Sequence, residues 1–319
     1  MTMYRDTLPQ LGGQLFLTDG GIETTLIFHE DLELPDFAAF HLLKTASGEA
    51  ALRKYFRTYV QLAKRFGTGF ILESPTWRAN PDWGARLGYG FVELAQANLR
   101  AIRLLEDVRA EAADAGVPMV ISGNVGPRGD GYVADNAMTA AGAEDYHARQ
   151  IDTFANSAAD MVCAATMNYV EEGVGVVRAA RRAGMPVAIL FTVETDGALP
   201  TGQTLRSAIE QTDAETDGYA SYFGINCAHP THFEHVLTGD GGWLQRIRAL
   251  RANASVKSHA ELNESTTLDA GDPSELGNQY SRLRTPLTGL SVVGGCCGTD
   301  DRHVEQIATA CSRPAGRQG

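Results

Sequence analysis

Short apolar runs and longer amphipathic runs alternate along almost the whole chain, and this alternation is the strongest constraint on its fold. Each apolar run has the length of one buried strand, and the runs between them have the three- and four-residue spacing of helices. Eight such units of roughly 40 residues favour a closed (β/α)8 barrel, the TIM barrel, over an open sheet. The predicted strands are Gln14–Thr18, Gly69–Glu73, Pro118–Gly123, Met161–Ala165, Pro186–Phe191, Tyr222–Asn226, Ala254–Lys257 and Leu290–Gly294.

The segments between the strands predict helices and two long insertions. Phe91–Gly116 is the longest helical pattern, and Val170–Ala183 repeats its arrangement. Residues His29–Lys44 and His259–Gly271 do not fit a minimal barrel. We expect both as loops on the carboxyl face of the strands, where barrels of this class hold their active sites.

Two adjacent cysteines surrounded by glycines follow the last predicted strand, in Gly294–Gly298. Neighbouring side chains of a regular strand point to opposite faces, so two thiols converge only where the backbone departs from strand geometry, which glycine permits. A third cysteine, Cys227, ends the sixth predicted strand. Three thiolates at strand ends form a credible zinc site with an open fourth position, as in catalytic zinc centres.

The barrel places further motifs beside these cysteines. Asp19–Thr24 follows the first predicted strand, Glu73–Thr76 the second and Gly123–Pro127 the third. Zinc with three thiolates is a poor generator of hydroxide, but it accepts a soft thiolate as its fourth ligand. Coordination keeps that thiolate ionised at pH 7, so the expected reaction is attack by sulfur on an activated carbon such as a methyl group.

Composition narrows the class of protein. The 319 residues are 44% hydrophobic and 21% charged, as expected for a chain that buries a full core. The net charge of −12 argues against a nucleic-acid partner, and no apolar run is long enough for a membrane span or a secretion signal. We expect a cytoplasmic protein with one domain over residues 1–319 and a flexible tail from about residue 312.

Three motifs resemble the homocysteine S-methyltransferase family of zinc-dependent barrels: Asp19–Thr24, Asn226-Cys227 and Gly294–Thr299, in this order and at these distances. The resemblance spans nearly the whole chain. It implies transfer of a methyl group from a sulfonium, betaine or folate donor to the thiol of homocysteine, which gives methionine.

The resemblance also implies the site residues. Cys227, Cys296 and Cys297 would be the zinc ligands, and Asp19 with the backbone of Gly20 and Gly21 would help to hold the amino-acid acceptor. The full set of candidates comprises Asp19, Glu23 and Asn226 as catalytic residues and Asp19, Gly20, Gly21, Glu73 and Thr166 as substrate-binding residues.

One departure from the family pattern concerns the acceptor. Many members have a glutamate after the fourth strand that helps to bind the ammonium group, whereas the matching position here is Ala165. Glu261 or Glu73 is a candidate replacement for the missing charge. Because little sequence follows the cysteine pair, we expect no cobalamin or folate domain, and we therefore expect a small donor such as S-methylmethionine.

Alternatives remain at this stage. The acceptor could be a different thiol, or the protein could be a zinc or thiol sensor without turnover. A thiol-disulfide oxidoreductase would use Cys296 and Cys297 as its redox pair, although adjacent cysteines form a strained ring. Asp19 could cap a turn and Glu23 could favour a helix start. Cys163 and Cys311 are expected in the core.

Overall fold

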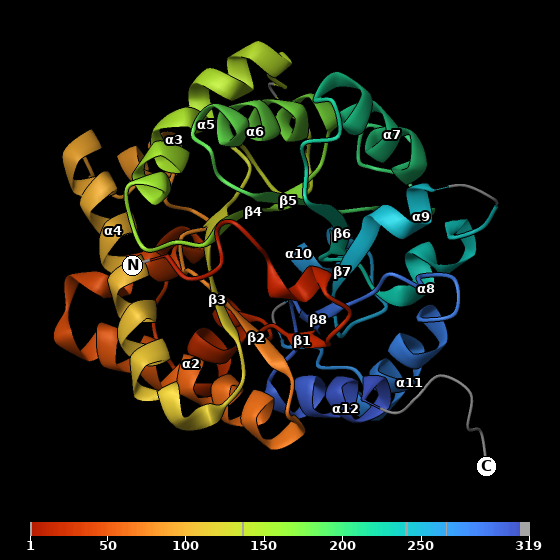
Figure 1. Ribbon diagram of the computed structural model, residues 1–319, viewed down its shortest axis with the longest axis horizontal. Coiled ribbons are helices and arrows are strands. Elements are labelled where there is room, and N and C mark those ends of the chain that lie inside the picture. Colours follow the sequence, from red (N-terminus) through yellow and green to blue (C-terminus); the bar gives the residue numbers. More distant parts are fainter. Residues whose placement is uncertain (1, 136, 240–241, 266, 313–319) are drawn as a thin grey trace.

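The computed structural model describes residues 2–135, 137–239, 242–265 and 267–312, so that the predicted tail, apart from Ser312, lies outside the described residues. Eight parallel strands pair in sequence order, and β8 pairs with β1 to close the barrel. Figure 1 shows the strands at the centre of a ring of helices. The chain is thus a single-domain (β/α)8 barrel, as predicted. The strands are β1 (Phe16–Leu17), β2 (Gly69–Glu73), β3 (Met119–Val125), β4 (Met161–Met167), β5 (Val187–Phe191), β6 (Tyr222–Asn226), β7 (Ile247–Ala252) and β8 (Val292–Gly295).

The helices of the outer ring alternate with the strands. The two helices predicted at Phe91–Gly116 and Val170–Ala183 are present as α4 and α6, and α4 ends earlier than predicted. Among the described helices, none combines the length and the apolar character needed to cross a bilayer. The helices are α1 (Ile22–Thr24), α2 (Ala46–Phe66), α3 (Pro81–Arg86), α4 (Phe91–Glu111), α5 (Ala140–Ala155), α6 (Val170–Arg182), α7 (Leu205–Glu215), α8 (Pro230–Phe233), α9 (Trp243–Arg246), α10 (His259–Asn263), α11 (Pro273–Leu283) and α12 (Asp301–Cys311).

The prediction of the seventh strand was wrong. Strand β7 runs over Ile247–Ala252, whereas Ala254–Lys257 follows it as irregular chain. Two arginines, Arg248 and Arg251, interrupt the apolar pattern of β7 and make it resemble an exposed segment. Arg251 is nevertheless buried, because its charge is paired inside the barrel with Asp19.

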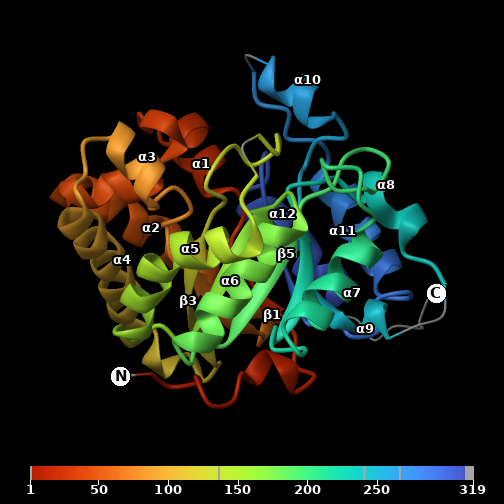
Figure 2. The same cartoon turned by 90° about the horizontal axis from the view of Figure 1, so that it is seen from above.

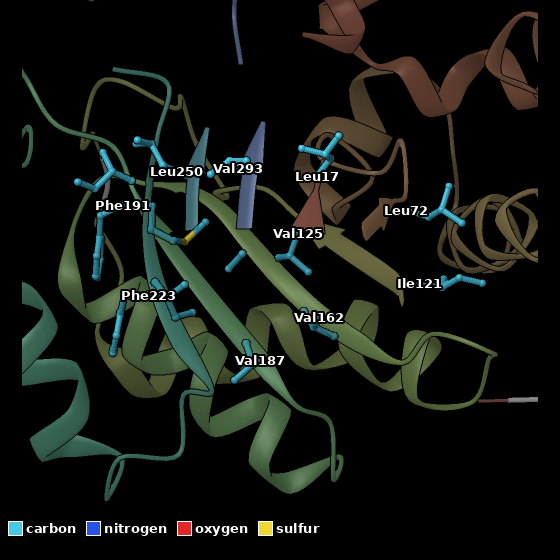
Figure 3. Packing of buried hydrophobic residues seen from close by; sticks show 14 of the residues in the cluster. Leu17, Leu72, Ile121, Val125, Val162, Val187, Phe191, Phe223, Leu250 and Val293 are labelled. Carbon is cyan, nitrogen blue, oxygen red and sulfur yellow. The ribbon is translucent and has the colours of Figure 1, made fainter. Parts of the chain in front are cut away.

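Two apolar layers stabilise the barrel. Side chains such as Phe16, Ile71 and Tyr222 point inward and fill its interior. A larger cluster packs the outer faces of the strands against the helices, and Figure 3 shows members of it on β1, β7 and β8, namely Leu17, Leu250 and Val293. Cys163 lies in the inner layer and Cys311 in the outer one, so both belong to the core as expected.

The two predicted insertions contain short helical turns. Residues 29–44 include the 3-10 turns Pro35–Phe37 and Ala39–Lys44, and residues 259–271 begin with α10. Figure 2 shows α10 projecting from the barrel on the same side as α1. The second insertion therefore lies at the same end of the barrel as α1, which follows β1.

Candidate active site

The three cysteines predicted as ligands lie together at the carboxyl ends of β6 and β8. The sulfur atoms of Cys227, Cys296 and Cys297 all lie within 4.8 Å of one another, and those of Cys227 and Cys297 are 3.9 Å apart. With zinc–sulfur bonds of about 2.3 Å, tetrahedral geometry requires about 3.8 Å between sulfurs. The separation of Cys227 and Cys297 therefore fits two sulfurs on one metal ion, and Cys296 lies close enough to be a third ligand, which would leave one position open.

A disulfide joins Cys227 and Cys296 in the structure, while Cys297 is a free, partly buried thiol. A sulfur that forms a disulfide is not available as a thiolate ligand, so the metal site requires the reduced form of this pair. The structure joins Cys296 to Cys227 and not to its neighbour Cys297.

Two left-handed residues aim the side chain of Cys227 at the other cysteines. Cys227 has φ 55° and Thr166, at the end of β4, has φ 63°. Asn226 links them, since its Oδ1 accepts a bond of 2.8 Å from the Thr166 N–H and its Nδ2 donates a bond of 2.8 Å to Thr166 Oγ1. Such backbone conformations cost on the order of 1–3 kcal/mol each in non-glycine residues, and they persist where the surroundings fix them.

We expect Asn226→Ala to loosen this arrangement. The variant leaves the left-handed Thr166 without its amide partner, so metal affinity should fall about 10- to 100-fold, as it does when ligand-supporting bonds are lost. Competition with a chromophoric chelator measures this affinity. The control is Asn156→Ala, which removes an exposed amide at the end of α5. Equal metal affinities for the two variants would contradict the assigned role.

The glycines of Gly294–Gly298 serve a purpose that differs from the predicted one. Gly294 and Gly295 belong to regular strand β8, and a side chain at Gly295 would collide with Thr299. Only Gly298 is left-handed among these glycines, with φ 79°. Close packing of Gly294 against Thr18 and of Gly295 against Thr299 therefore explains the pair of glycines, and the cysteines follow after the strand has ended.

The predicted carboxylate Asp19 is already engaged by the protein. Its Oδ1 accepts a bond of 2.6 Å from Arg251 Nη2, and its Oδ2 accepts one of 2.9 Å from the Tyr55 hydroxyl. Burial raises the pKa of Asp19, and the guanidinium of Arg251 partly offsets this effect. Asp19 thus fixes the chain that leads into Gly20 and Gly21, where the Gly21 N–H donates to the Thr299 carbonyl at 3.1 Å. Sequence reasoning missed Arg251 because its strand was not recognised.

Glu73 lies at the end of β2 and is buried. Burial raises its pKa to about 7, and the nearby Arg251 only partly offsets this effect. One of its carboxyl oxygens, Oε2, has no hydrogen-bond partner among the described residues. Glu261, the other predicted replacement charge, is exposed, and its carboxylate is occupied by hydrogen bonds from Ser258 at the start of α10.

The raised pKa of Glu73 predicts a pH-dependent effect on stability. A buried acid with a folded pKa of about 7 keeps a proton that the unfolded chain releases above its ordinary pKa of 4.5. The free energy of unfolding should therefore fall as pH rises between these values. Glu73→Gln has no proton to release in this range. The free energy of unfolding of the variant, relative to that of wild type, should therefore be up to about 3 kcal/mol higher at pH 7.5 than at pH 4.5. Urea unfolding at both pH values checks this, and a pH-independent difference would contradict it.

Two residues that the sequence did not single out cover the cysteines. The Tyr132 hydroxyl lies 3.5 Å from Cys297 Sγ, and the Tyr132 ring packs against His259 with 4.1 Å between ring centroids. His259 Nε2–H donates to the Cys227 carbonyl. Burial raises the pKa of the Cys297 thiol, so a bound cation would be needed to hold it as thiolate at neutral pH.

Glu23 and Arg78 complete the mouth of the site. Burial and the negative charge of Asp19 raise the pKa of Glu23 to about 7, and Glu23 also interacts electrostatically with Cys297. The Arg78 guanidinium carbon lies 4.1 Å from the Trp77 ring centroid and 3.7 Å from that of Trp83. Burial lowers the pKa of Arg78 to about 10, so it stays a cation at pH 7.

The chain forms an eight-stranded barrel in which three cysteine sulfurs converge at the carboxyl ends of β6 and β8. These features define a class of barrels that could hold a metal ion through thiolate ligands. The particular member of this class follows from comparison with known proteins. The chain belongs to the homocysteine S-methyltransferase family, whose model matches residues 16–311.

Curated relatives match the chain over part of their length. It is 33% identical over 150 residues to methionine synthase of Mycobacterium tuberculosis, covering 43% of this chain and 11% of that protein. It is 24% identical over 184 residues to betaine–homocysteine S-methyltransferase 1 of Bos taurus, covering 50% of this chain and 42% of that protein. The matched region is thus less than half the length of either relative.

Two solved structures share the fold over nearly the whole chain. The oxidised form of the homocysteine methyltransferase MmuM from Escherichia coli matches with a TM-score of 0.74 and 18% identity, covering 94% of this chain and 97% of that one. Its metallated form matches with a TM-score of 0.71 and 17% identity, covering 94% and 98%.

Proposed function

We propose that this protein is a zinc-dependent methyltransferase that moves a methyl group from a small sulfonium or betaine donor, such as S-methylmethionine, to the thiol of homocysteine. The observation that carries the proposal is the convergence of Cys227, Cys296 and Cys297 at the mouth of a barrel of this family. Three thiolates leave one ligand position for a substrate sulfur.

The proposed metal ligands are the three cysteines in their reduced form. When bound there, zinc supplies the positive charge that keeps a substrate thiol ionised at neutral pH. The protein holds the ligands in place through Asn226 and Thr166, whose paired hydrogen bonds fix the chain before Cys227. Gly20 and Gly21, held by Asp19 and Thr299, provide a rigid wall close to Cys296.

The transfer balances without any further reactant. The acceptor thiol releases its proton to solvent as it binds. An electron pair of the acceptor sulfur forms a bond to the methyl carbon of the donor, while the bond between that carbon and the donor atom breaks. The donor atom is the sulfur of a sulfonium or the nitrogen of a betaine, and the electron pair of the broken bond stays on it and neutralises its positive charge. With S-methylmethionine as donor, both products are methionine.

Turnover with isotope-labelled S-methylmethionine tests the proposal. Reduced protein loaded with zinc is mixed with homocysteine, and mass spectrometry follows the labelled methyl group in methionine. We expect one zinc per chain and labelled methionine from the acceptor. Full activity in protein freed of metal would contradict the proposal.

Two other outcomes identify the alternatives. Methyl transfer to a thiol other than homocysteine would keep the mechanism and change the acceptor. Other thiols are a relevant comparison because alanine occupies position 165, where many members of the family have a glutamate. Stoichiometric zinc without transfer to any thiol, from any sulfonium or betaine donor, would favour a sensor.

A further inference from the structure

His259 is the first residue of α10 and lies beside the three cysteines. It is 8% exposed, whereas the other residues of α10, which projects from the barrel in Figure 2, are exposed or half-buried. A polar ring buried at the start of an exposed helix is costly unless its nitrogens have partners. Both ring nitrogens of His259 do face a partner, and the two partners lie in segments that follow β5 and β6.

The Nε2 atom of His259 contacts the chain of the cysteine site directly. Its N–H donates to the carbonyl of Cys227, and Asn253 Nδ2 donates to the same oxygen at 3.0 Å. Cys227 has a left-handed backbone with φ 55°, and such a conformation persists where neighbouring groups hold it. Asn226 fixes the chain before Cys227, so His259 holds the same residue from its carbonyl side.

The Nδ1 atom of His259 fixes the direction of the ring. It lies 3.4 Å from Oε1 of Glu194. Glu194 belongs to a turn in which its N–H donates to the Ala198 carbonyl at 2.8 Å and its carbonyl accepts from the Gly197 N–H at 2.9 Å. Because the imidazole is held at two atoms, its ring cannot rotate without losing one of these contacts.

Tyr132 packs against the face of this fixed ring. The two ring centroids are 4.1 Å apart, with 35° between the ring planes. The Tyr132 hydroxyl lies 3.5 Å from Cys297 Sγ, and the Tyr132 N–H donates to Asp130 Oδ1 at 2.7 Å. The backbone of Tyr132 is thus held by its own turn, whereas the orientation of its ring over Cys297 depends on His259.

We propose that His259 is a positioning residue of the cysteine site. It directs the Cys227 sulfur through the carbonyl of that residue, and its ring keeps Tyr132 over the Cys297 sulfur. One side chain therefore links the segments that follow β3, β5 and β7 to cysteines at the ends of β6 and β8. The part that concerns the metal rests on the proposed function, because it takes the three cysteines to hold a metal ion.

Two substitutions separate the hydrogen bond of His259 from its ring. His259→Gln keeps a donor near the position of Nε2 and removes the ring, whereas His259→Phe keeps a ring and removes both polar contacts. Competition with a chromophoric chelator gives the zinc affinity of the reduced protein. His259→Phe should lower this affinity about 3- to 10-fold, as expected for the loss of one hydrogen bond, and His259→Gln should keep the wild-type value.

Alkylation of Cys297 measures the cover that Tyr132 provides, and it needs no metal. In the disulfide form, Cys297 is the free thiol among the three, while Cys163 and Cys311 are buried. With iodoacetamide and peptide mass spectrometry, His259→Gln should alkylate Cys297 about 3- to 10-fold faster than wild type, as expected for the loss of one aromatic pair. His259→Phe should react at the wild-type rate.

His232→Phe is the matched control. His232 is 6% exposed, and its Nε2 pairs with the Val256 carbonyl at 2.9 Å, so it also tethers the chain that follows β7, but not through a cysteine. Zinc affinity and alkylation rate should both stay at their wild-type values. A loss of zinc affinity equal to that of His259→Phe would show that attachment of this segment, rather than the contact with Cys227, is what matters, and it would overturn the inference.

The outcomes separate this inference from the proposed function. Wild-type zinc affinity in His259→Phe, or wild-type alkylation in His259→Gln, would overturn the inference even if methyl transfer is observed. The two opposite effects would support it even if the zinc-loaded protein transfers no methyl group, in which case only the proposed function fails. If His259→Phe does not fold, faster alkylation of His259→Gln with wild-type zinc affinity supports the inference, and unchanged alkylation overturns it.

Discussion

Replacing Cys297 by alanine is expected to release the metal and to abolish methyl transfer. The variant leaves two thiolates where the site provides three, and a structural zinc site contributes about 10–16 kcal/mol through all its ligands. Loss of one ligand should weaken binding by about 3–5 kcal/mol, or roughly a hundred- to a few thousandfold. Metal content after dialysis and formation of labelled methionine measure the two effects.

The matched control for this variant is Cys311→Ala. Cys311 is buried in α12 and lies outside the group of three cysteines, so its removal should leave metal content unchanged. Retention of stoichiometric zinc by Cys297→Ala would show that Cys297 is not a ligand. Retained zinc with normal turnover would also remove the main support for the proposed function.

Replacing Arg251 by methionine is expected to cost about 3–5 kcal/mol of folding free energy, the range found when one partner of a buried ion pair is removed. The change leaves Asp19 buried without its cation and also removes a bond of 3.2 Å from Arg251 Nε to the Gly295 carbonyl. Chemical denaturation of wild type and variant at pH 7 measures the loss.

An exposed ion pair provides the comparison for Arg251. Arg206 and Glu210 lie four residues apart on α7 and are both about half exposed, so Arg206→Met should cost only about 0.3–0.5 kcal/mol. The double variant with Arg251→Met and Asp19→Asn should recover part of the loss, because no unpaired carboxylate remains. Equal losses for Arg251→Met and Arg206→Met would contradict the proposed importance of the buried pair.

The architecture and the clustering of the three cysteines were predictable because their signals are local. Strands such as β2 and β6 are continuous apolar runs, and their predicted bounds match the structure. Cys227 and Cys296 are distant in sequence, but each follows a recognised strand, and parallel strands of one barrel end on the same face. The position of strand β7 was not predicted because Arg251 is buried through its ion pair with Asp19, which lies 232 positions away in the sequence.

The rest of the site depends on loops that the sequence alone does not place. Tyr132 and His259 meet over Cys297 although they belong to segments that follow β3 and β7. Arg78 looks like an ordinary surface residue until its stacking between two tryptophans is seen. Left-handed Thr166 and Cys227 carry no glycine signal, because the Asn226 amide rather than residue type permits their conformation.

The shortest strand of the barrel gives Arg251 a second significance. Strand β1 contributes only two residues, so two residue pairs join it to β8 and two join it to β2. The side chain of Arg251 extends from β7 past β8 to Asp19, which lies two residues after the end of β1. The ion pair between Arg251 and Asp19 thus reinforces the short pairing of β1 with β8. Since the same ion pair anchors the chain into Gly20 and Gly21, we expect that separation of β1 from β8 would at the same time displace the residues proposed to bind the substrate.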